Sequence, residues 1–194
     1  MNSGDLKKVR DLHAAWLRDE VGGVRADLRS ADLSYADLRS ADLRSADLRS
    51  ADLRYADLRY ANLRSADLSY ADLRYADLRS ADLRSADLRY ADLRSADLPS
   101  PGVVLLSDWG SLANESVAAL MRLDASAHPD PEAFDRWARG GSCPYSGVKV
   151  QRAANFNENK DLWIPGPPPT LWEAMCMVLD EKCPGWREEK EESK

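Results

Sequence analysis

A run of fifteen consecutive pentapeptides, without one insertion, occupies residues 26–100. Each pentapeptide reads Ala, then Asp or Asn, then Leu, then two variable residues. In an α-helix five residues turn through about 500°, so successive leucines would be spread over every face. In a straight strand side chains alternate, so an odd period would send successive leucines to opposite faces. The leucines share one interior only if the backbone bends about once per pentapeptide, which predicts a solenoid of stacked coils.

The motif Ala-(Asp/Asn)-Leu-x-x, present here as A-D-L-R-S and A-D-L-R-Y, resembles that of the pentapeptide-repeat proteins over residues 26–100. The resemblance implies a mainly β fold, a right-handed quadrilateral β-helix with four pentapeptides per coil and with Leu and Ala turned inward. Asn62 replaces Asp, which the family pattern allows, and Ser34, Ser69 and Pro99 replace Arg. Since proline lacks an N–H for the backbone ladder, we expect regular stacking to end at Pro99.

We expect residues 1–25 to form a helical cap on the first coil. A solenoid needs caps because its terminal coils would otherwise expose the leucine cross-section and an open backbone edge. Ser3 is the expected helix N-cap, and Gly22-Gly23 is expected to end the helix. We interpret His13 as structural, since it lies on the apolar side of the helix. The positions on that side are Leu6, Val9, His13, Trp16 and Leu17.

Beyond the repeats, residues 101–186 are predicted to form a C-terminal capping and helical module, and residues 187–194 a charged tail. The apolar run Val103–Leu106 is expected to be a final strand that closes the last coil. The segment Cys143–Pro169 is expected to be irregular, with an extended proline-rich end.

Three helices are expected in this module. The first covers residues 114–125, where apolar side chains recur at helical spacing. An Asp-Pro pair at 130–131 is typical of a helix start, and a Gly-Gly pair at 140–141 of a helix end. The third helix, 170–182, begins with Thr and has Glu173 three residues later, which predicts a capping box. Its predicted apolar face is Leu171, Met175, Val178 and Leu179.

The chain contains no apolar run long enough to span a bilayer and no signal-peptide pattern, which predicts a cytoplasmic protein without membrane contact. Its three cysteines agree with a reducing compartment. Cys176 and Cys183 are roughly 10 Å apart by helical rise, too far to pair. Together with Cys143 and His128 they are a conceivable zinc site, but no Cys-x-x-Cys spacing supports it. We therefore expect no metal and no cofactor.

The sequence gives no support for catalysis. Every Asp of the repeats has the same expected environment beside an Arg, so no carboxylate pair is singled out for a shifted pKa. A nucleophile elbow, a phosphate-binding loop and a metal-binding helix motif are all missing from the sequence. We therefore expect that the protein is not an enzyme.

Tyrosine occupies the fifth position of several pentapeptides. Residues twenty apart are expected to form columns along the coil axis, one strand spacing of about 4.8 Å apart. Tyr35, Tyr55 and Tyr75 form one expected column, and Tyr70 and Tyr90 form another on a different face. Such columns offer aromatic contact area for a partner or for self-association into a homo-oligomer. The alternative is that tyrosine is merely tolerated at duplicated positions.

Some pentapeptide-repeat proteins are thought to mimic DNA and to bind DNA gyrase, but the charge of these repeats is mixed. The array carries fourteen Asp and twelve Arg, a net charge of only two negatives. An array of nearly four coils is roughly 18 Å long, and duplex DNA of that length carries about ten negative charges. A salt-bridged surface of alternating sign is expected instead, which also argues against nucleic-acid binding by the array.

The C-terminal module is a second candidate for binding, because irregular segments on a rigid scaffold commonly carry binding residues. Basic and aromatic groups together can hold a small nucleotide or an acidic protein surface. The alternative is that the aromatic residues form a core and that the basic residues are ordinary surface. The residues in question are Tyr145, Lys149, Arg152, Phe156, Lys160 and Trp163.

We expect a non-enzymatic interaction protein with a protein partner. The N-terminal helix, its Gly-Gly exit and the helical C-terminal module also resemble pentapeptide-repeat proteins of bacteriophages. That resemblance implies a role in blocking or sequestering a host component, such as a defence protein or its nucleotide signal. Two alternatives stay open: a DNA-mimic modulator of DNA gyrase or topoisomerase, and a structural or oligomeric scaffold.

Overall fold

The computed structural model describes residues 3–128, 130, 132–141 and 160–186. They fall into two compact units, each of which is described by itself. Of the described residues, 3–110 and 182–186 belong to the first unit, and those between Ser111 and Glu181 belong to the second. This division differs from the predicted one, because residues 101–110 and 182–186 belong with the repeats rather than with the C-terminal module.

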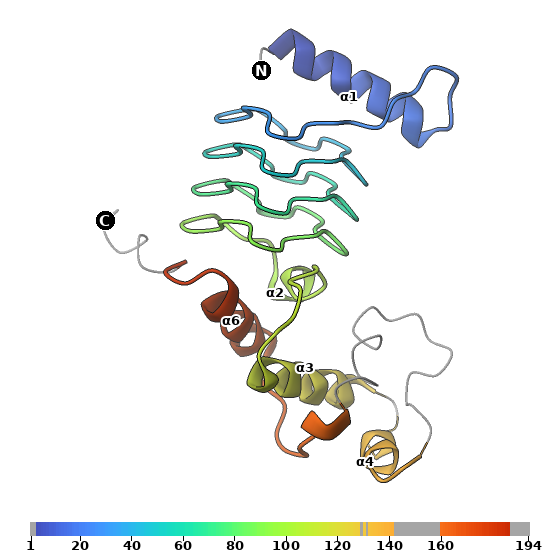
Figure 1. The fold of residues 1–194 in the computed structure, drawn as a ribbon, viewed down its shortest axis with the longest axis vertical. Helices are drawn as coiled ribbons and strands as arrows, with labels where there is room; N and C mark the ends of the chain where they lie inside the picture. Colours follow the sequence, from blue (N-terminus) through green and yellow to red (C-terminus); the bar gives the residue numbers. More distant parts are fainter. Residues whose placement is uncertain (1–2, 129, 131, 142–159, 187–194) are drawn as a thin grey trace. The chain divides into compact units, whose positions relative to one another are not determined.

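The repeats form coils that stack through parallel β-bridges between residues twenty apart, from Asp27–Asp47 to Asp77–Asp97 (Figure 1). At each step the Leu N–H donates to the Asp carbonyl of the next coil, as Leu28 does to Asp47 at 2.7 Å. The Asp47 N–H in turn donates to the Ala26 carbonyl at 3.0 Å. Within the described residues each side of a coil pairs through one bridge, and no longer strand is present.

The corners of the coils lie at the fourth and fifth positions of each pentapeptide. The Leu28 carbonyl accepts a hydrogen bond from the Ala31 N–H at 3.1 Å, and the same turn recurs every five residues. The fifth residue is Ser or Tyr and has a positive φ, from 52° at Ser40 to 62° at Tyr90. This left-handed conformation costs a non-glycine residue about 1 kcal/mol, so burial and coil-to-coil hydrogen bonds must offset that strain at every corner.

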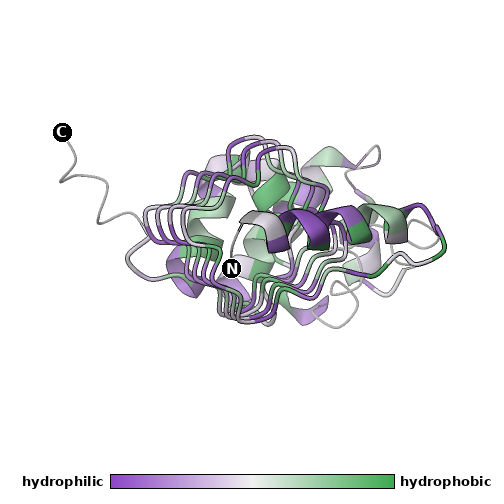
Figure 2. Ribbon diagram, turned by 90° about the horizontal axis from the view of Figure 1, so that it is seen from above, coloured by the Kyte–Doolittle hydropathy of each residue, from purple (hydrophilic) through white to green (hydrophobic). Residues whose placement is uncertain are grey.

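The interior of the coils is filled by the invariant Leu and Ala. The leucines from Leu28 to Leu93 are 0–2% exposed, and the alanines from Ala41 to Ala96 are at most 5% exposed. Burying one Leu stabilises the fold by roughly 2 kcal/mol. Seen along the axis, successive coils lie in register (Figure 2), which confirms the predicted inward placement of both residue types.

Helix α1, Ser3–Leu17, covers part of the first coil (Figure 1). Ser3 is its first helical residue rather than the cap before it. His13 is fully buried, and its Nδ1 accepts a hydrogen bond from the Ala26 N–H at 3.0 Å. The predicted structural role of His13 is therefore confirmed. Trp16, expected on the packed side, is 36% exposed.

The chain that follows Pro99 closes the last coil without the expected strand at Val103–Leu106. Helix α2, Pro101–Val104, forms there, because Pro101 at the first helical position suits a helix start and the Leu105 N–H donates to the Pro101 carbonyl at 3.0 Å. The last bridge is made further along, by Asp108 to Asp87.

Residues that follow the repeats contact the last coil. The Leu93 N–H, which has no regular coil after it, donates to the Cys183 Sγ at 3.4 Å. Trp109 and Trp186 are buried in the same unit, at 6% and 8% exposure. The last coil is thus capped by α2 together with the segment around Cys183.

The second unit contains α3 (Asn114–Ala127), α4 (Ala133–Ala138), the 3₁₀ turn η1 (Lys160–Leu162) and most of α6 (Leu171–Lys182). The prediction of the first of these helices is confirmed. α4 begins later than the Asp-Pro pair suggested, because Asp130 accepts the Ala133 N–H through its backbone carbonyl. The core of the unit comprises Met121, Ala125, Phe134 and Trp137, with Val117, Leu162 and Trp163 packed against it.

The predicted capping box of α6 is present. The Glu173 N–H donates to Thr170 Oγ1 at 3.2 Å, and the Thr170 N–H donates to Glu173 Oε2 at 2.7 Å. Met175, Val178 and Leu179 are buried as predicted. Leu171 is 47% exposed, so its place on the apolar face was wrong. No helix in the described part of the chain is long and apolar enough to cross a membrane.

Candidate functional site

The tyrosines form two stacked columns on the outside of the coils. The rings of Tyr35, Tyr55 and Tyr75 lie 4.8 Å apart, centroid to centroid, at interplanar angles of 5° and 2°. Tyr70 and Tyr90 stack at 4.7 Å and 17°. The predicted columns are therefore confirmed as geometry, and all five side chains are exposed, from 41% at Tyr75 to 73% at Tyr35.

The two columns border one side of the array rather than different sides. Tyr70 and Tyr75 are five residues apart, and each occupies a corner at one end of the stretch Ala71–Leu73. The expectation that Tyr70 and Tyr90 mark a separate face is corrected, because the fifth position of a pentapeptide is a corner shared by two sides. We call the side between these corners, containing residues 31–33, 51–53, 71–73 and 91–93, the tyrosine-bordered face.

The faces themselves carry an Arg–Asp ladder. Arg54 donates from Nε to Asp52 Oδ1 at 2.8 Å and from Nη2 to Asp52 Oδ2 at 2.5 Å. The same guanidinium lies 3.7 Å from Asp72 Oδ2 in the next coil. This pattern recurs along the array and confirms the expected salt-bridged surface of alternating sign.

Arginines of the ladder lower the pKa of several of its carboxylates. The hydrogen bond from Arg29 lowers the pKa of Asp27 to about 2, and that from Arg39 lowers the pKa of Asp37 to about 2. The pKa values of Asp42 and Asp47 are lowered for the same main reason, a bidentate arginine. A general acid needs a carboxyl that retains its proton near neutral pH, so these carboxylates are unsuited to that role.

Before the last pentapeptide, where Pro99 replaces the arginine, three positions interrupt the ladder. Ser34 and Ser69 replace the arginine, and their hydroxyls donate to Asp32 and Asp67, in each case at 2.6 Å. Asn62 accepts the backbone N–H two residues on, at 3.3 Å, but offers no carboxylate to the Arg side chain there. The substitutions thus change the charge of single steps without changing the coil.

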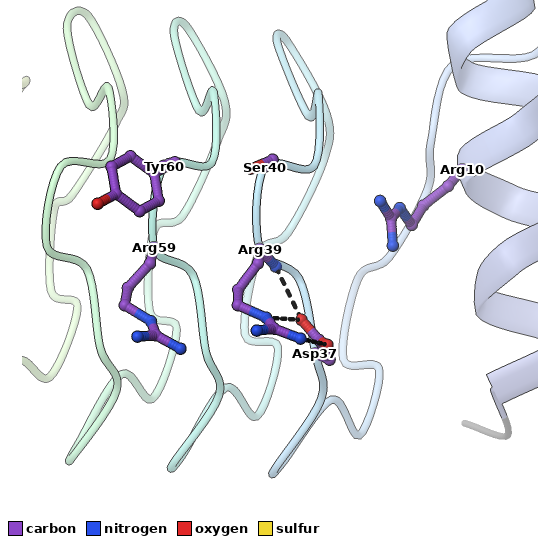
Figure 3. Close-up of a pocket in the computed structure, with 6 residues that line it drawn as sticks. All are labelled: Arg10, Asp37, Arg39, Ser40, Arg59 and Tyr60. Atoms are coloured by element: carbon purple, nitrogen blue, oxygen red, sulfur yellow. Dashed lines mark hydrogen bonds and ion pairs between the residues drawn. The ribbon is translucent and has the colours of Figure 1, made fainter.

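A first cleft, of about 490 Å³, lies where α1 approaches the coils (Figure 3). Arg10 projects from α1 toward the coils and makes no ion pair within the described residues. Asp37 holds Arg39 through bonds of 2.9 and 2.6 Å. Guanidinium and hydroxyl groups together can donate hydrogen bonds to an oxyanion. The lining is Arg10, Asp37, Arg39, Ser40, Arg59 and Tyr60.

A second cleft, of about 760 Å³, lies between α1 and the first coil. Arg10 and Asp37 line both clefts. Its lining also includes Leu33, Tyr35 and Ala36 of the first coil. Sequence reasoning missed both clefts. The twenty-residue spacing of Arg39 and Arg59 could have indicated that both line the first cleft. Arg10 lies outside the repeats, and no sequence pattern indicates that it lines the clefts.

The binding residues expected in the C-terminal module are only partly described. Trp163 donates from Nε1 to Asp135 Oδ1 at 3.1 Å, and its ring lies 5.3 Å from that of Phe134. Lys160 Nζ lies 5.6 Å from the centre of the Trp137 ring. Both residues thus contribute to the packing of the second unit, and their role in binding stays a prediction. Tyr145, Lys149, Arg152 and Phe156 lie outside the described residues.

The structure gives the conceivable zinc site no ligand cluster in the part of the chain that it describes. Cys176 and Cys183 are buried and form no disulfide within the described residues, and burial raises the pKa of the Cys183 thiol. A protonated thiol is a poor metal ligand, because zinc binds the thiolate. Cys143 lies outside the described residues.

Burial of His13 predicts a pH-dependent stability. Desolvation lowers the pKa of His13, and the Arg44 backbone and the Asp42 carboxylate oppose this only in part, while the Arg25 and Arg44 charges reinforce it. The unfolded chain then binds the proton more readily. The part of the folding free energy that depends on neutral His13 is therefore fully present above about pH 6.5. It is lost as the pH falls below that value. Melting temperatures measured between about pH 5 and pH 8 should show this slope.

The matched control is His13→Asn, whose Oδ1 lies where His13 Nδ1 lies and can accept the Ala26 N–H but does not titrate. The slope below about pH 6.5 should vanish in this variant. Asp27 and Asp37, with pKa values of about 2, contribute only at lower pH, below about pH 4, so the two windows are separate. An equal slope in both proteins would contradict the assignment to His13.

Comparison with known proteins supports the repeat architecture. The family model described as pentapeptide repeats (8 copies) matches residues 26–64 and 61–98. No curated protein sequence matches the chain. Among solved structures, HetL of the cyanobacterium Nostoc sp. strain PCC 7120, a pentapeptide repeat protein involved in heterocyst differentiation regulation, is 48% identical. That match covers 38% of this chain and 34% of HetL, with a TM-score of 0.36.

Two further structures are similar. Rfr23 of the cyanobacterium Cyanothece 51142 is 33% identical over 43% of this chain and 54% of its own, with a TM-score of 0.37. A pentapeptide repeat protein of Nostoc PCC 7120 is 36% identical over 52% of this chain and 93% of its own, with a TM-score of 0.29. The chain thus spans about a third of HetL and about half of Rfr23. From the repeats, their twenty-residue bridges and the family match, the chain belongs to the pentapeptide-repeat family.

Proposed function

We propose that the protein is a non-enzymatic binding scaffold and that its tyrosine-bordered face docks a protein partner. The observation that carries this proposal is the stacking of Tyr35, Tyr55 and Tyr75 at 4.8 Å. Tyrosine supplies a large contact area with little loss of side-chain entropy, and it is enriched in protein interfaces. A row held at fixed spacing by the coils is already ordered before a partner arrives, so less entropy is lost on binding.

The Arg–Asp ladder between the columns favours a partner that contacts the tyrosines first. Each guanidinium already has a carboxylate in its own coil, as Arg74 has Asp72 at 2.7 Å. Taking such pairs out of water costs free energy unless the partner replaces the lost hydration. Burying Tyr70 and Tyr75 at the corners desolvates no ion pair, so these tyrosines are the expected anchors of the interface. The ladder between them is expected to form its polar part.

The assignment as a binding protein rather than an enzyme rests on the chemistry of the ladder. Arginine hydrogen bonds lower the pKa of carboxylates such as Asp37 and Asp47, and burial raises the pKa of the Cys183 thiol. Nucleophilic and acid–base catalysis both need groups whose pKa lies near the working pH. The same pairing disfavours mimicry of DNA, because most carboxylates of the array, such as Asp52 and Asp57, are paired with a guanidinium group in their own coil.

The scaffold that presents this surface is proposed to be a right-handed quadrilateral β-helix. Four turns per twenty residues and the parallel bridges support four sides per coil. A cytoplasmic location and a phage origin, with a host or defence component as the partner, are extensions of the proposal. A purely oligomeric scaffold is the remaining alternative, in which the columns of two copies would face each other.

The proposal is tested by a triple substitution, Tyr35→Ser, Tyr55→Ser and Tyr75→Ser. Serine already occupies the same corner position in other pentapeptides, for example at Ser95, so the coil should be unaffected. Partners captured by the unchanged protein should be lost by the variant. For a partner then purified, we expect the Kd to rise about 30-fold, since loss of an aromatic hot spot costs about 2 kcal/mol.

The matched control changes a corner without tyrosine, through Ser45→Ala, Ser65→Ala and Ser85→Ala. It should keep both the partner and the affinity. Light scattering of all three proteins separates partner docking from self-association, because an oligomeric scaffold would lose mass in the tyrosine variant alone. Equal partner affinity in the tyrosine variant and the control would refute the docking role of the columns.

A further inference from the structure

The first coil has a backbone edge that every later coil uses. In the second coil, the Asp57 N–H donates to the Ala36 carbonyl at 3.0 Å, and the Asp57 carbonyl accepts the Leu38 N–H at 2.9 Å. Asp37 occupies the equivalent position in the first coil, where no coil precedes it. Within the described residues, neither its backbone N–H nor its backbone carbonyl has a hydrogen-bond partner, and the same holds for the Ser34 carbonyl.

α1 does not seal the cross-section above this edge. Ala31 and Ala36 are half-buried, although the alanines from Ala41 to Ala96 are at most 5% exposed. The second cleft described above, of about 760 Å³, opens at this point between α1 and residues 32–37. The first coil therefore combines an unpaired backbone edge with a partly apolar cavity above it.

We propose that this cleft binds an extended peptide from a protein partner, which adds one further side to the coil by backbone pairing. Addition of a strand to an exposed edge is a common mode of peptide recognition, in which main-chain hydrogen bonds give affinity and side-chain pockets give specificity. The pairing would be parallel, since every bridge in the array is parallel.

The sequence of the peptide can be derived from the array, because each coil shows which residues pair with the coil that follows it. Tyr35 donates its N–H to the Arg54 carbonyl at 2.9 Å and stacks on Tyr55 at 4.8 Å. A peptide tyrosine in the corresponding place would donate to the Ser34 carbonyl and stack on Tyr35. The next peptide residue must be small, and its carbonyl would accept the Asp37 N–H.

The remaining peptide positions follow in the same way. Two residues after the small one, a leucine would donate its N–H to the Asp37 carbonyl and place its side chain against Leu6, Ala14 and Leu33, which line the cleft. An arginine after it would reach the Asp37 carboxylate, as Arg39 Nε reaches Asp57 Oδ2 at 3.6 Å. The expected ligand is therefore Tyr-Ala-x-Leu-Arg.

Arg10 is compatible with this ligand. It lines the cleft and acts on the Asp37 carboxylate from α1, but it makes no ion pair in the described part of the chain. Its guanidinium can therefore move aside or share the carboxylate with the peptide arginine. Asp37 already accepts Arg39 in its own coil. The peptide arginine would add the second contact, which Asp57 receives from Arg39 of the coil before it.

The test uses the full chain and the synthetic peptide acetyl-Tyr-Ala-Asp-Leu-Arg-amide in titration calorimetry. We expect saturable binding, and an at least tenfold weaker affinity for the same peptide methylated on the leucine nitrogen, since methylation removes the N–H offered to Asp37. Equal binding of the two peptides would overturn the proposal, and so would absence of binding of the unmodified peptide at millimolar concentration.

Two variants locate the peptide. Asp37→Asn should weaken binding about fivefold, but should leave unchanged the affinity of a peptide ending in Ser instead of Arg. Asp57→Asn, in the same column of a later coil, is the matched control and should bind as the unchanged protein does. An equal loss in both variants, or a loss for the Ser peptide in Asp37→Asn, would refute the proposed register.

This inference deepens the proposed function, because Tyr35 belongs both to the tyrosine column and to the cleft, but the two can fail separately. Tyr55→Ser and Tyr75→Ser together remove most of the column and leave the edge of the first coil intact. That double variant should lose affinity for the docked partner and keep the peptide. Loss of both ligands, or of the peptide alone, would show that the peptide does not bind at this edge.

Discussion

Leu58→Ala is expected to lower the free energy of unfolding by about 3 kcal/mol. Leu58 is 0% exposed and lies inside the array, with leucines of the same column in the coils before and after it. Removing its side chain loses the transfer free energy of the buried atoms and leaves a cavity, because stacked coils cannot collapse onto one another. Urea denaturation followed by circular dichroism measures the change.

Leu98→Ala is the matched control for this substitution. Leu98 occupies the same position in its pentapeptide but is half-buried at the end of the array. Its truncation should cost well under half as much, since less apolar surface is buried and solvent can fill the space. If both variants lost the same free energy, the coil interior would not be the source of stability.

Gly23→Ala is expected to destabilise the protein by about 3 kcal/mol, through α1 rather than through the coils. A Cβ at Gly23 would clash with the backbone nitrogen of Trp16 and would lie 2.6 Å from the backbone carbon of Ala15. Backbone atoms cannot turn away as a side chain can, so the turn after α1 must open. We expect a lower melting temperature and a change in the fluorescence of Trp16.

Gly102→Ala provides the comparison, because a Cβ there meets no atom within 4 Å and the residue lies in α2. Alanine in an open helical position should be neutral or slightly stabilising. A destabilisation at Gly102 as large as that at Gly23 would mean that loss of glycine flexibility, and not the contact with Trp16, sets the cost.

The coils could be predicted from the sequence because one physical constraint repeats fifteen times. A single period settled the placement of Leu28 to Leu93, and each repeat independently supported it. The segment after Pro99 is not repeated, so its structure had to be predicted from a single stretch of sequence. Val103–Leu106 is a short apolar run, which fits a strand or a helix equally, and Pro101 at a helical first position decided for the helix. Likewise Leu171 matched the helical period but lies at the exposed start of α6.

The candidate site, too, could be predicted from the sequence only in part. The tyrosine columns followed from arithmetic on residue numbers, because the coil turns a period of twenty into vertical neighbours. Their common face did not follow, since it depends on whether the fifth residue is a side or a corner of the coil. The clefts depend on how α1 lies over the first coil, and Arg10 reaches them from outside the repeat. Such tertiary placement leaves no pattern in the sequence.

The left-handed corners have a consequence for how such a protein can change over generations. From Ser30 to Ser95 the fifth residue of each pentapeptide has the same backbone conformation, whether it is serine or tyrosine. The main chain therefore does not change when one replaces the other. Exchanges at these positions leave the interior untouched and alter only what is displayed, on a grid whose vertical step is 4.8 Å. New surface patterns can therefore arise by single codon changes, without a new fold to be found.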